Sequence, residues 1–190
     1  MSGIKAAQLS KVAYVAAVLF VVSLARFFVI PLLRLPADSP IVAELNGGLL
    51  PVAAHMLLFP IVAALPAPGW ARAAGYGWLV TDMTTDIMAL NGVPPTIYLA
   101  MRYGGHISAA LWIATASWQA KGAVRIVGLL LALILGGYSF IAPLPGVPMY
   151  VLYPTLVLIP LWLGLVGRLF VRGAGDQHEQ AEVVREQTTA

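Results

Sequence analysis

Seven ionisable side chains lie inside stretches of the sequence that are otherwise apolar. They are Arg26, Glu44, His55, Asp82, Asp86, Arg102 and His106. A charged side chain in the middle of a bilayer costs roughly 3 kcal/mol on insertion scales, so several of them on different segments indicate one shared site in which the charges compensate each other. Two carboxylates near an arginine and a histidine can hold different protonation states, one as an acid and one as a base, as proton transfer requires.

The spacing of these residues places them on common faces of helices. Asp82 and Asp86 are four positions apart, so they lie one turn apart on the same face. Two further stripes repeat at helical intervals: Tyr98, Arg102 and His106 form one, and Glu44, Gly48, Pro51 and His55 form the other. The sequence therefore predicts that these helices surround a polar pocket.

The composition defines the class of protein that must position this pocket. The chain has 190 residues, of which 60% are hydrophobic and only 10% are charged, which is typical of an integral membrane protein. Cysteine is absent from the sequence, which excludes disulfides, thiolate metal sites, iron–sulfur clusters and a cysteine nucleophile. The net charge of +3 lies mostly in loops and tails, so it indicates membrane topology and not nucleic-acid binding.

Six apolar segments are separated by clusters of proline, glycine and charged residues. They cover residues 12–33, 41–65, 71–90, 95–118, 124–142 and 149–170. Each has about the 20 residues that a helix needs to cross a bilayer. We expect an all-α polytopic transmembrane bundle of six spans in one domain, residues 1–172, followed by a polar, flexible cytoplasmic tail, residues 173–190. The first segment is too long for the apolar region of a signal peptide and is predicted to be a retained helix.

The basic residues near the ends of these segments predict the orientation. All seven fall on one side of a six-span arrangement: Lys5, Lys11, Arg72, Lys121, Arg125, Arg168 and Arg172. If the chain is a multi-pass protein of a bacterial inner membrane, the positive-inside rule then places both termini in the cytoplasm. At a rise of about 1.5 Å per residue, six of the seven ionisable residues fall in the outer half of the bilayer, and His55 lies deeper.

Several of these residues have a purely structural alternative. Arg26 can extend to the lipid headgroups, and Glu44 can be a solvated residue at the start of its helix. His55 can be a packed histidine bonded to a backbone carbonyl. Arg102 can serve as the structural counter-charge of one aspartate. Most aromatic residues lie near the predicted ends of spans, as in an interfacial belt; three others are candidates for a ligand wall, namely Trp78, Tyr98 and Trp112.

The predicted function is an acid–base enzyme, an isomerase or cyclase, acting on a lipophilic substrate such as a terpenoid or lipid. The predicted catalytic residues are Asp82, Asp86, Arg102, His106 and Glu44, and the predicted substrate-binding residues are Trp78, Tyr98, Trp112, Arg26 and His55. In this scheme Asp82 or Asp86 is the acid, His106 or Glu44 the base, and Arg102 the electrostatic anchor. In outline the chain resembles small polytopic membrane cyclases and isomerases, in which carboxylates on facing helices act on terpenoids, but no motif transfers individual residues.

Two other functions fit the same residues. A small transporter, or a substrate-binding membrane subunit, would use the acids to bind a proton, a cation or a small solute, although no inverted repeat is evident. An accessory subunit of a larger membrane complex, or a homo-oligomer, would place the charges on a docking face. Histidine boxes such as HxxxH and HExxH are absent, as are nucleotide-binding and serine-hydrolase motifs, so no metal and no cofactor is predicted.

Overall fold

The computed structural model describes residues 3–34, 36, 39–40, 48–142, 144 and 146–189, without the side chains of residues 3–5, 24–31, 33, 149 and 174–189. Two predicted site residues are affected by these limits. Glu44 lies outside the described residues, and of Arg26 only the backbone, within the first helix, is described. The described ranges are helical and contain no strand, which confirms the predicted all-α class.

Three of the helices match predicted segments to within two residues, and the others begin or end elsewhere. The helices are α1 (Gly3–Leu33), α3 (Leu49–Met56), α4 (Phe59–Ala64), α5 (Gly69–Leu90), α6 (Pro95–Gln119), α7 (Ala123–Ile141), the short 3₁₀ helix η1 (Met149–Leu152) and α8 (Tyr153–Thr189). Prolines precede or begin α5, α6 and η1, where the missing backbone N–H needs no partner and the fixed φ angle suits a helix start.

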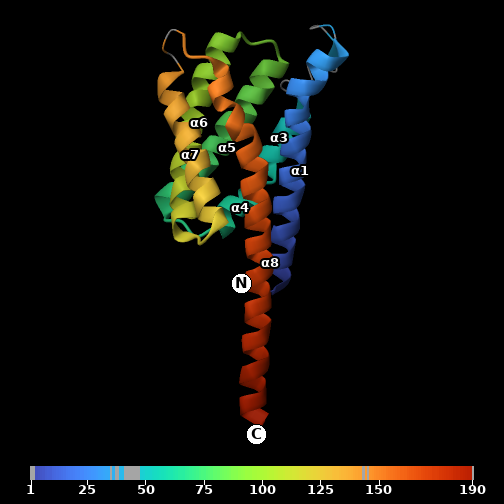
Figure 1. Cartoon of the computed structure of the whole chain (residues 1–190), viewed down its shortest axis with the longest axis vertical. Helices are drawn as coiled ribbons and strands as arrows, with labels where there is room; N and C mark the ends of the chain where they lie inside the picture. Colours follow the sequence, from blue (N-terminus) through green and yellow to red (C-terminus); the bar gives the residue numbers. More distant parts are fainter. Residues whose placement is uncertain are drawn as a thin grey trace.

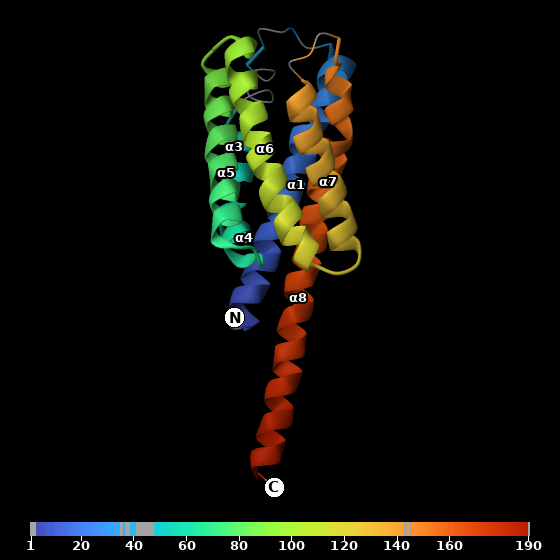
Figure 2. The same ribbon diagram turned by 90° about the vertical axis from the view of Figure 1, so that its left-hand side faces the viewer.

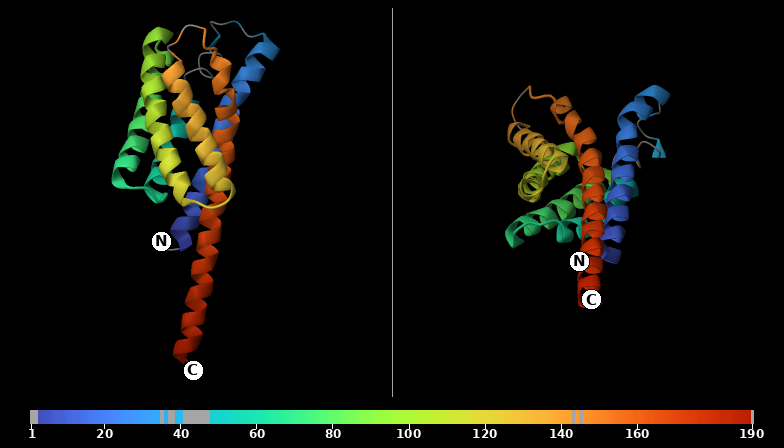
Figure 3. Two further views of the ribbon diagram at one scale, coloured as in Figure 1. Left: turned by 60° about the vertical axis from the view of Figure 1, so that its left-hand side comes forward. Right: turned by 60° about the horizontal axis from the view of Figure 1, so that its bottom comes forward.

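The helices run side by side along one long axis and alternate in direction (Figures 1 and 2). α6 packs between α5 and α7, and α8 packs between α7 and α1, while α3 and α4 contact both α1 and α5. Figure 3 shows α8 between α1 and the pair formed by α6 and α7. Both termini therefore lie at the same end of the bundle, as the predicted topology requires.

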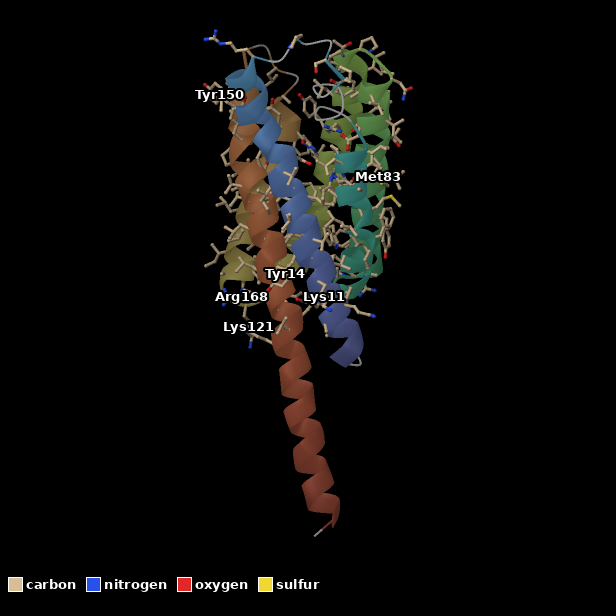
Figure 4. All side chains as sticks on the ribbon, turned by 90° about the vertical axis from the view of Figure 1, so that its right-hand side faces the viewer. Lys11, Tyr14, Met83, Lys121, Tyr150 and Arg168 are labelled. Atoms are coloured by element: carbon tan, nitrogen blue, oxygen red, sulfur yellow. The ribbon has the colours of Figure 1, made fainter. Side chains whose placement is uncertain are left out.

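The two ends of the bundle differ in charge. Figure 4 shows Lys11, Lys121 and Arg168 gathered at one end, which we call the basic end, whereas Tyr150 lies at the other. We call the other end the site end; there α5 finishes at Leu90 and α6 begins. This separation agrees with the side on which the sequence placed the basic residues.

The second predicted segment, residues 41–65, is not one continuous helix. It breaks between α3 and α4 at residues 57–58. Pro60 explains the break, because it has no N–H to donate to the carbonyl of Met56 and its ring would clash with that carbonyl in a continuous helix. The chain instead turns with a bond of 3.0 Å from the Leu58 N–H to the His55 carbonyl. His55 thus lies directly before a helix break.

α8 continues as a helix through residues 173–189, the predicted tail, and extends beyond the rest of the bundle (Figure 1). After Pro160 the helix contains no further proline, and its last part contains several glutamate and glutamine residues, which favour helix. The flexibility expected of this tail stays a prediction.

Three helices are long and apolar enough to cross a membrane by length and composition. Among the described residues these segments are Ala6–Ser23, Ala123–Ile141 and Tyr150–Gly173. α5 and α6 have 22 and 25 residues, but Asp82, Asp86, Arg102 and His106 reduce their apolar character. The predicted transmembrane class is confirmed to this extent, and the count of six spans stays a prediction.

Candidate functional site

Asp82, near the site end of α5, is the centre of a buried polar cluster. The indole N–H of Trp78, one turn earlier on α5, donates to Asp82 Oδ2 at 2.7 Å. His55 Nε2 from α3 lies 3.3 Å from the same oxygen, and His106 Nε2 from α6 lies 3.7 Å from it. Three helices thus direct nitrogen atoms at one carboxylate oxygen, and the aspartate is only 4% exposed.

Asp86, one turn further along α5, forms an ion pair with Arg102 from α6. Arg102 Nε also donates to the Thr85 hydroxyl at 2.9 Å, and that hydroxyl donates to the Asp82 carbonyl at 2.8 Å. Arg102 is therefore held against α5 by a carboxylate and a hydroxyl. Such fixed, charge-assisted bonds define the position of a guanidinium better than a single contact would.

His55 occupies the space between the two aspartates. Its Nδ1 lies 2.8 Å from the Pro51 carbonyl oxygen on α3 and 3.5 Å from Asp86 Oδ2. The ring contacts Phe20 of α1 and Trp78 edge to face, at centroid distances of 5.4 and 5.8 Å. The structural alternative expected for His55, a packed histidine bonded to a backbone carbonyl, agrees with the contact of Nδ1. The other ring nitrogen, Nε2, faces Asp82.

A cavity of about 160 Å³ borders the cluster. One wall contains the polar residues just described. The rest is mainly apolar and comes from α1, α6, α7, η1 and α8: Phe20, Leu99, Leu135, Leu152, Leu156 and Ile159. A cavity with a few converging polar groups in an apolar wall is the usual form of a small-molecule site.

The structure brings together six of the predicted site residues at this cavity. They are His55, Trp78, Asp82, Asp86, Arg102 and His106. Tyr98 and Trp112, which were expected to form part of a ligand wall, do not line it. Trp112 is fully buried, stacks on Trp78 and meets Trp162 edge to face, so it belongs to the apolar core. The sequence could not distinguish a ligand wall from the apolar core, because both environments favour a tryptophan on the inward face of a helix.

Other lining residues were missed. Ser23, Tyr103, Tyr153 and Thr155 also line the cavity, and Thr85 supports Arg102. The position of Thr85, between two acids on the same helix face, was a usable signal. The positions on α8 carried no signal, because neutral residues among apolar ones form no recognisable pattern.

Four buried polar atoms around the cavity have no hydrogen-bond partner among the described residues. They are Ser23 Oγ, Asp82 Oδ1, Asp86 Oδ2 and His106 Nδ1. Buried polar groups are normally paired, so unpaired ones at a cavity mark where a ligand or water would bond. Among the described residues, no group of three or more histidine, aspartate or glutamate side chains is arranged to hold a metal ion.

Comparison with protein-family models, with curated protein sequences and with solved structures finds no match to this chain. We therefore infer function from the geometry of the cluster and cavity, taken with the chemistry of the residues that form them.

Proposed function

We propose that the protein is an intramembrane acid–base enzyme, an isomerase or cyclase, acting on a lipophilic substrate such as a terpenoid or lipid. The observation that carries this proposal is Asp82: a buried carboxylate, contacted by two imidazoles and an indole N–H, beside a cavity whose remaining wall is mainly apolar. A protonatable group in a site that excludes water can protonate an alkene or epoxide without competition from solvent.

The contacts divide the roles between the two aspartates. Arg102 neutralises Asp86, which leaves Asp82 as the carboxyl group that exchanges a proton with a substrate. In an isomerisation, a proton passes from His55 Nε2 to Asp82, 3.3 Å away, and the Asp82 carboxyl group delivers it to one alkene carbon, where the π electrons form the new C–H bond. His106 then takes a proton from a neighbouring carbon, and the electron pair left behind forms the new double bond. The proton returns from His106 to Asp82 across their 3.7 Å contact and from Asp82 to His55, so the site is restored.

The aromatic wall suits the cationic intermediate of such a reaction. Phe20 and Trp78 both line the cavity, and the face of an aromatic ring attracts a cation. Apolar side chains from α7 and α8, Leu135, Leu156 and Ile159, add a surface against which a hydrocarbon substrate would pack. The cavity therefore provides both an acid and an aromatic and apolar surface beside it.

We also propose that all six passes span the membrane, with both termini in the cytoplasm. On α5 and α6 many large apolar side chains are exposed although the site residues are charged: Trp70, Val80, Ile87, Leu90, Ile97, Met101, Leu111 and Trp118. Two threonines on these faces, Thr84 and Thr115, bond back to carbonyls of their own helices at 2.8 and 2.6 Å. Such surfaces fit lipid, because they expose little unsatisfied polarity.

The absence of cysteine gives a direct test of this topology. Single cysteines placed at Gly92, between α5 and α6, and at Gly122, between α6 and α7, can be labelled in intact cells with a membrane-impermeant maleimide. Labelling of G92C alone is expected, with G122C labelled only after the cells are opened. Labelling of both or of neither in intact cells would contradict six spans in this orientation.

The catalytic proposal is tested by comparing lipid and metabolite extracts of cells that express the wild type or the Asp82→Asn or His106→Gln variant. Loss of proton exchange should deplete the same product, and accumulate the same precursor, in both variants. Thr84→Val is the matched control, since Thr84 is on the same helix but faces outward. Identical extracts from all four, at equal membrane levels of protein, would refute the enzyme.

A second candidate, a transporter for a proton or cation, is supported by the helix break that follows His55. Interrupted helices beside buried acids are typical of transporter binding sites. Proteoliposomes with an internal pH dye distinguish the two: a transporter moves protons or the cation, whereas an enzyme leaves the gradient unchanged. The accessory-subunit alternative needs the charges on an outer surface, but Asp82 and Asp86 are buried.

A further inference from the structure

The position of one proton in the cluster follows from the atoms around His55. The Pro51 carbonyl oxygen, 2.8 Å from Nδ1, can only accept a hydrogen bond. Nδ1 must therefore carry a hydrogen for this contact to be favourable. In a neutral imidazole the other nitrogen, Nε2, would then have a lone pair and no hydrogen.

That nitrogen faces a carboxylate oxygen. Nε2 lies 3.3 Å from Asp82 Oδ2, and both ring and carboxylate are buried. A lone pair directed at an ionised oxygen would be repulsive, so a proton must lie between the two atoms. The Asp82 oxygen already accepts the Trp78 N–H at 2.7 Å, which is the behaviour of an ionised acceptor and places this proton on His55.

The charge balance of the cavity leads to the same result. Among the side chains that the structure describes, the titratable groups that line it with His55 are Asp82 and Asp86 from α5, Arg102, Tyr103 and His106 from α6, and Tyr153 from α8. Within this described set, two carboxylates and one guanidinium leave one uncompensated negative charge, which is costly in a medium of low dielectric constant. One imidazolium removes it. His55 is better placed to hold this charge than His106, because it contacts both aspartates at 3.5 Å or less.

We propose that His55 is an imidazolium bridging Asp82 and Asp86, that the resting cluster is therefore electrically neutral, and that the site accepts an uncharged ligand in preference to a cation. The choice of ligand class rests on the proposed function, whereas the protonation of His55 rests on the contacts of the ring. A cation would have to displace the imidazolium proton to enter, and an anion would meet two carboxylates.

The cavity volume limits the part of the ligand that it holds. An engineered protein cavity of about 150 Å³ binds benzene, so one six-membered ring fits a cavity of this size. Cyclohexanol and cyclohexylammonium are suitable probes, because they are close in size and differ in charge. The hydroxyl of cyclohexanol can also donate to one of the unpaired aspartate oxygens.

The protonation state can be measured without a substrate. The chain has only three histidines, so the protein labelled with ¹⁵N-histidine in detergent micelles gives few signals, assigned with the His55→Gln, His106→Gln and His178→Gln variants. At about pH 8 an ordinary histidine is neutral, since its pKa is about 6.5. We expect one imidazolium signal, with both nitrogens protonated, that disappears in His55→Gln. A His55 signal with an unprotonated Nε2 would overturn the proposal.

The two probes then test the ligand class on the same sample. Cyclohexanol is expected to shift the His55 and Trp78 signals while His55 keeps both protons, and cyclohexylammonium is expected to bind at least tenfold more weakly. Tighter binding of cyclohexylammonium, with loss of a His55 proton, would refute the neutral-ligand class and support cation exchange. Because these readouts need no turnover, unchanged lipid extracts would refute the enzyme alone and would leave the protonation result intact.

Discussion

Trp112 and Arg102 lie on the same helix, about three turns apart, and stabilise the molecule in opposite ways. Trp112 is fully buried between Trp78 and Trp162, at ring distances of 5.9 and 5.5 Å, in the apolar core towards the basic end. Arg102, towards the site end, is surrounded by a carboxylate, a hydroxyl and a backbone carbonyl. Each half of α6 therefore faces a different kind of interior.

The difference between the surroundings of Trp112 and Arg102 indicates how a small bundle can hold buried charges. Packing of large rings against glycines gives the basic end its stability, whereas the charges at the site end must be matched one by one or they destabilise it. Trp78 joins the two regions, because its ring stacks on Trp112 and its N–H bonds to Asp82. The region of buried charge is thus supported by a region of apolar packing.

The largest expected effect comes from removing one partner of the buried ion pair. Arg102→Met leaves Asp86 as an uncompensated buried charge and should lower the free energy of unfolding by about 3–5 kcal/mol. The double variant Arg102→Met/Asp86→Leu removes both charges and should recover most of this loss. Denaturant titration of the protein in detergent micelles measures both.

The matched control for this pair is Arg125→Met, the same change on an arginine that stacks on the exposed Trp118 at the end of the bundle. It should change the free energy of unfolding by less than about 1 kcal/mol. Arg102→Met could lower the free energy of unfolding no more than Arg125→Met does, or the double variant could be no more stable than Arg102→Met. Either result would mean that matched charges do not stabilise the site end.

Substitution of Trp78, the residue that joins the two regions, should have the next largest effect on the free energy of unfolding. Trp78→Phe keeps an aromatic ring against Trp112 but removes the hydrogen bond to Asp82, which should cost roughly 1.5–3 kcal/mol, since bonds to charged groups are the strong ones. Trp70→Phe is the control, because Trp70 lies on the same helix and is exposed. Equal stability of the two variants, measured by denaturant titration, would mean that the regions are not coupled through this bond.

Much of the site could be predicted from local spacing. Asp82 and Asp86, like Arg102 and His106, are four positions apart, and the helical period alone determines that each pair shares a face. The position of the polar site near one end followed from their distance to the nearest proline and glycine turn. Such features depend on residues close in the chain, which a sequence shows directly.

The features of the site that could not be predicted depend on contacts between segments that are far apart in the sequence. The two-sided role of His55 arises because α3 ends beside it and α5 packs against it, and no local pattern contains that information. The walls from α7 and α8 consist of ordinary apolar residues such as Leu135 and Leu156, which look the same in a core or a cavity. For the same reason the sequence could not show that Trp112 does not line this cavity.

A smaller effect should follow from filling the closest helix contact of the apolar core. A Cβ atom added at Gly128 of α7 would overlap the Ser117 side chain and come within 2.6 Å of Trp162 Nε1. Gly128→Ala should therefore cost about 1–3 kcal/mol through overpacking. Gly137→Ala on the same helix is the control, since a Cβ there meets nothing within 4 Å and alanine favours helix. Equal unfolding curves for the two variants would show that α6, α7 and α8 are not closely packed here.

The smallest effect is expected from the one side-chain hydrogen bond within this contact. Trp162 Nε1 donates to Ser117 Oγ at 3.1 Å, and both residues are buried. Ser117→Ala leaves the indole N–H without its acceptor and should cost about 1 kcal/mol. Ser139→Ala removes a buried hydroxyl that bonds only to the Leu135 carbonyl of its own helix, at 2.8 Å, so it should cost less. The difference between these serine variants in denaturant titrations measures what polarity contributes to the apolar region. A loss in Ser117→Ala as large as that in Arg102→Met would mean that the two regions do not differ in the way their structures indicate.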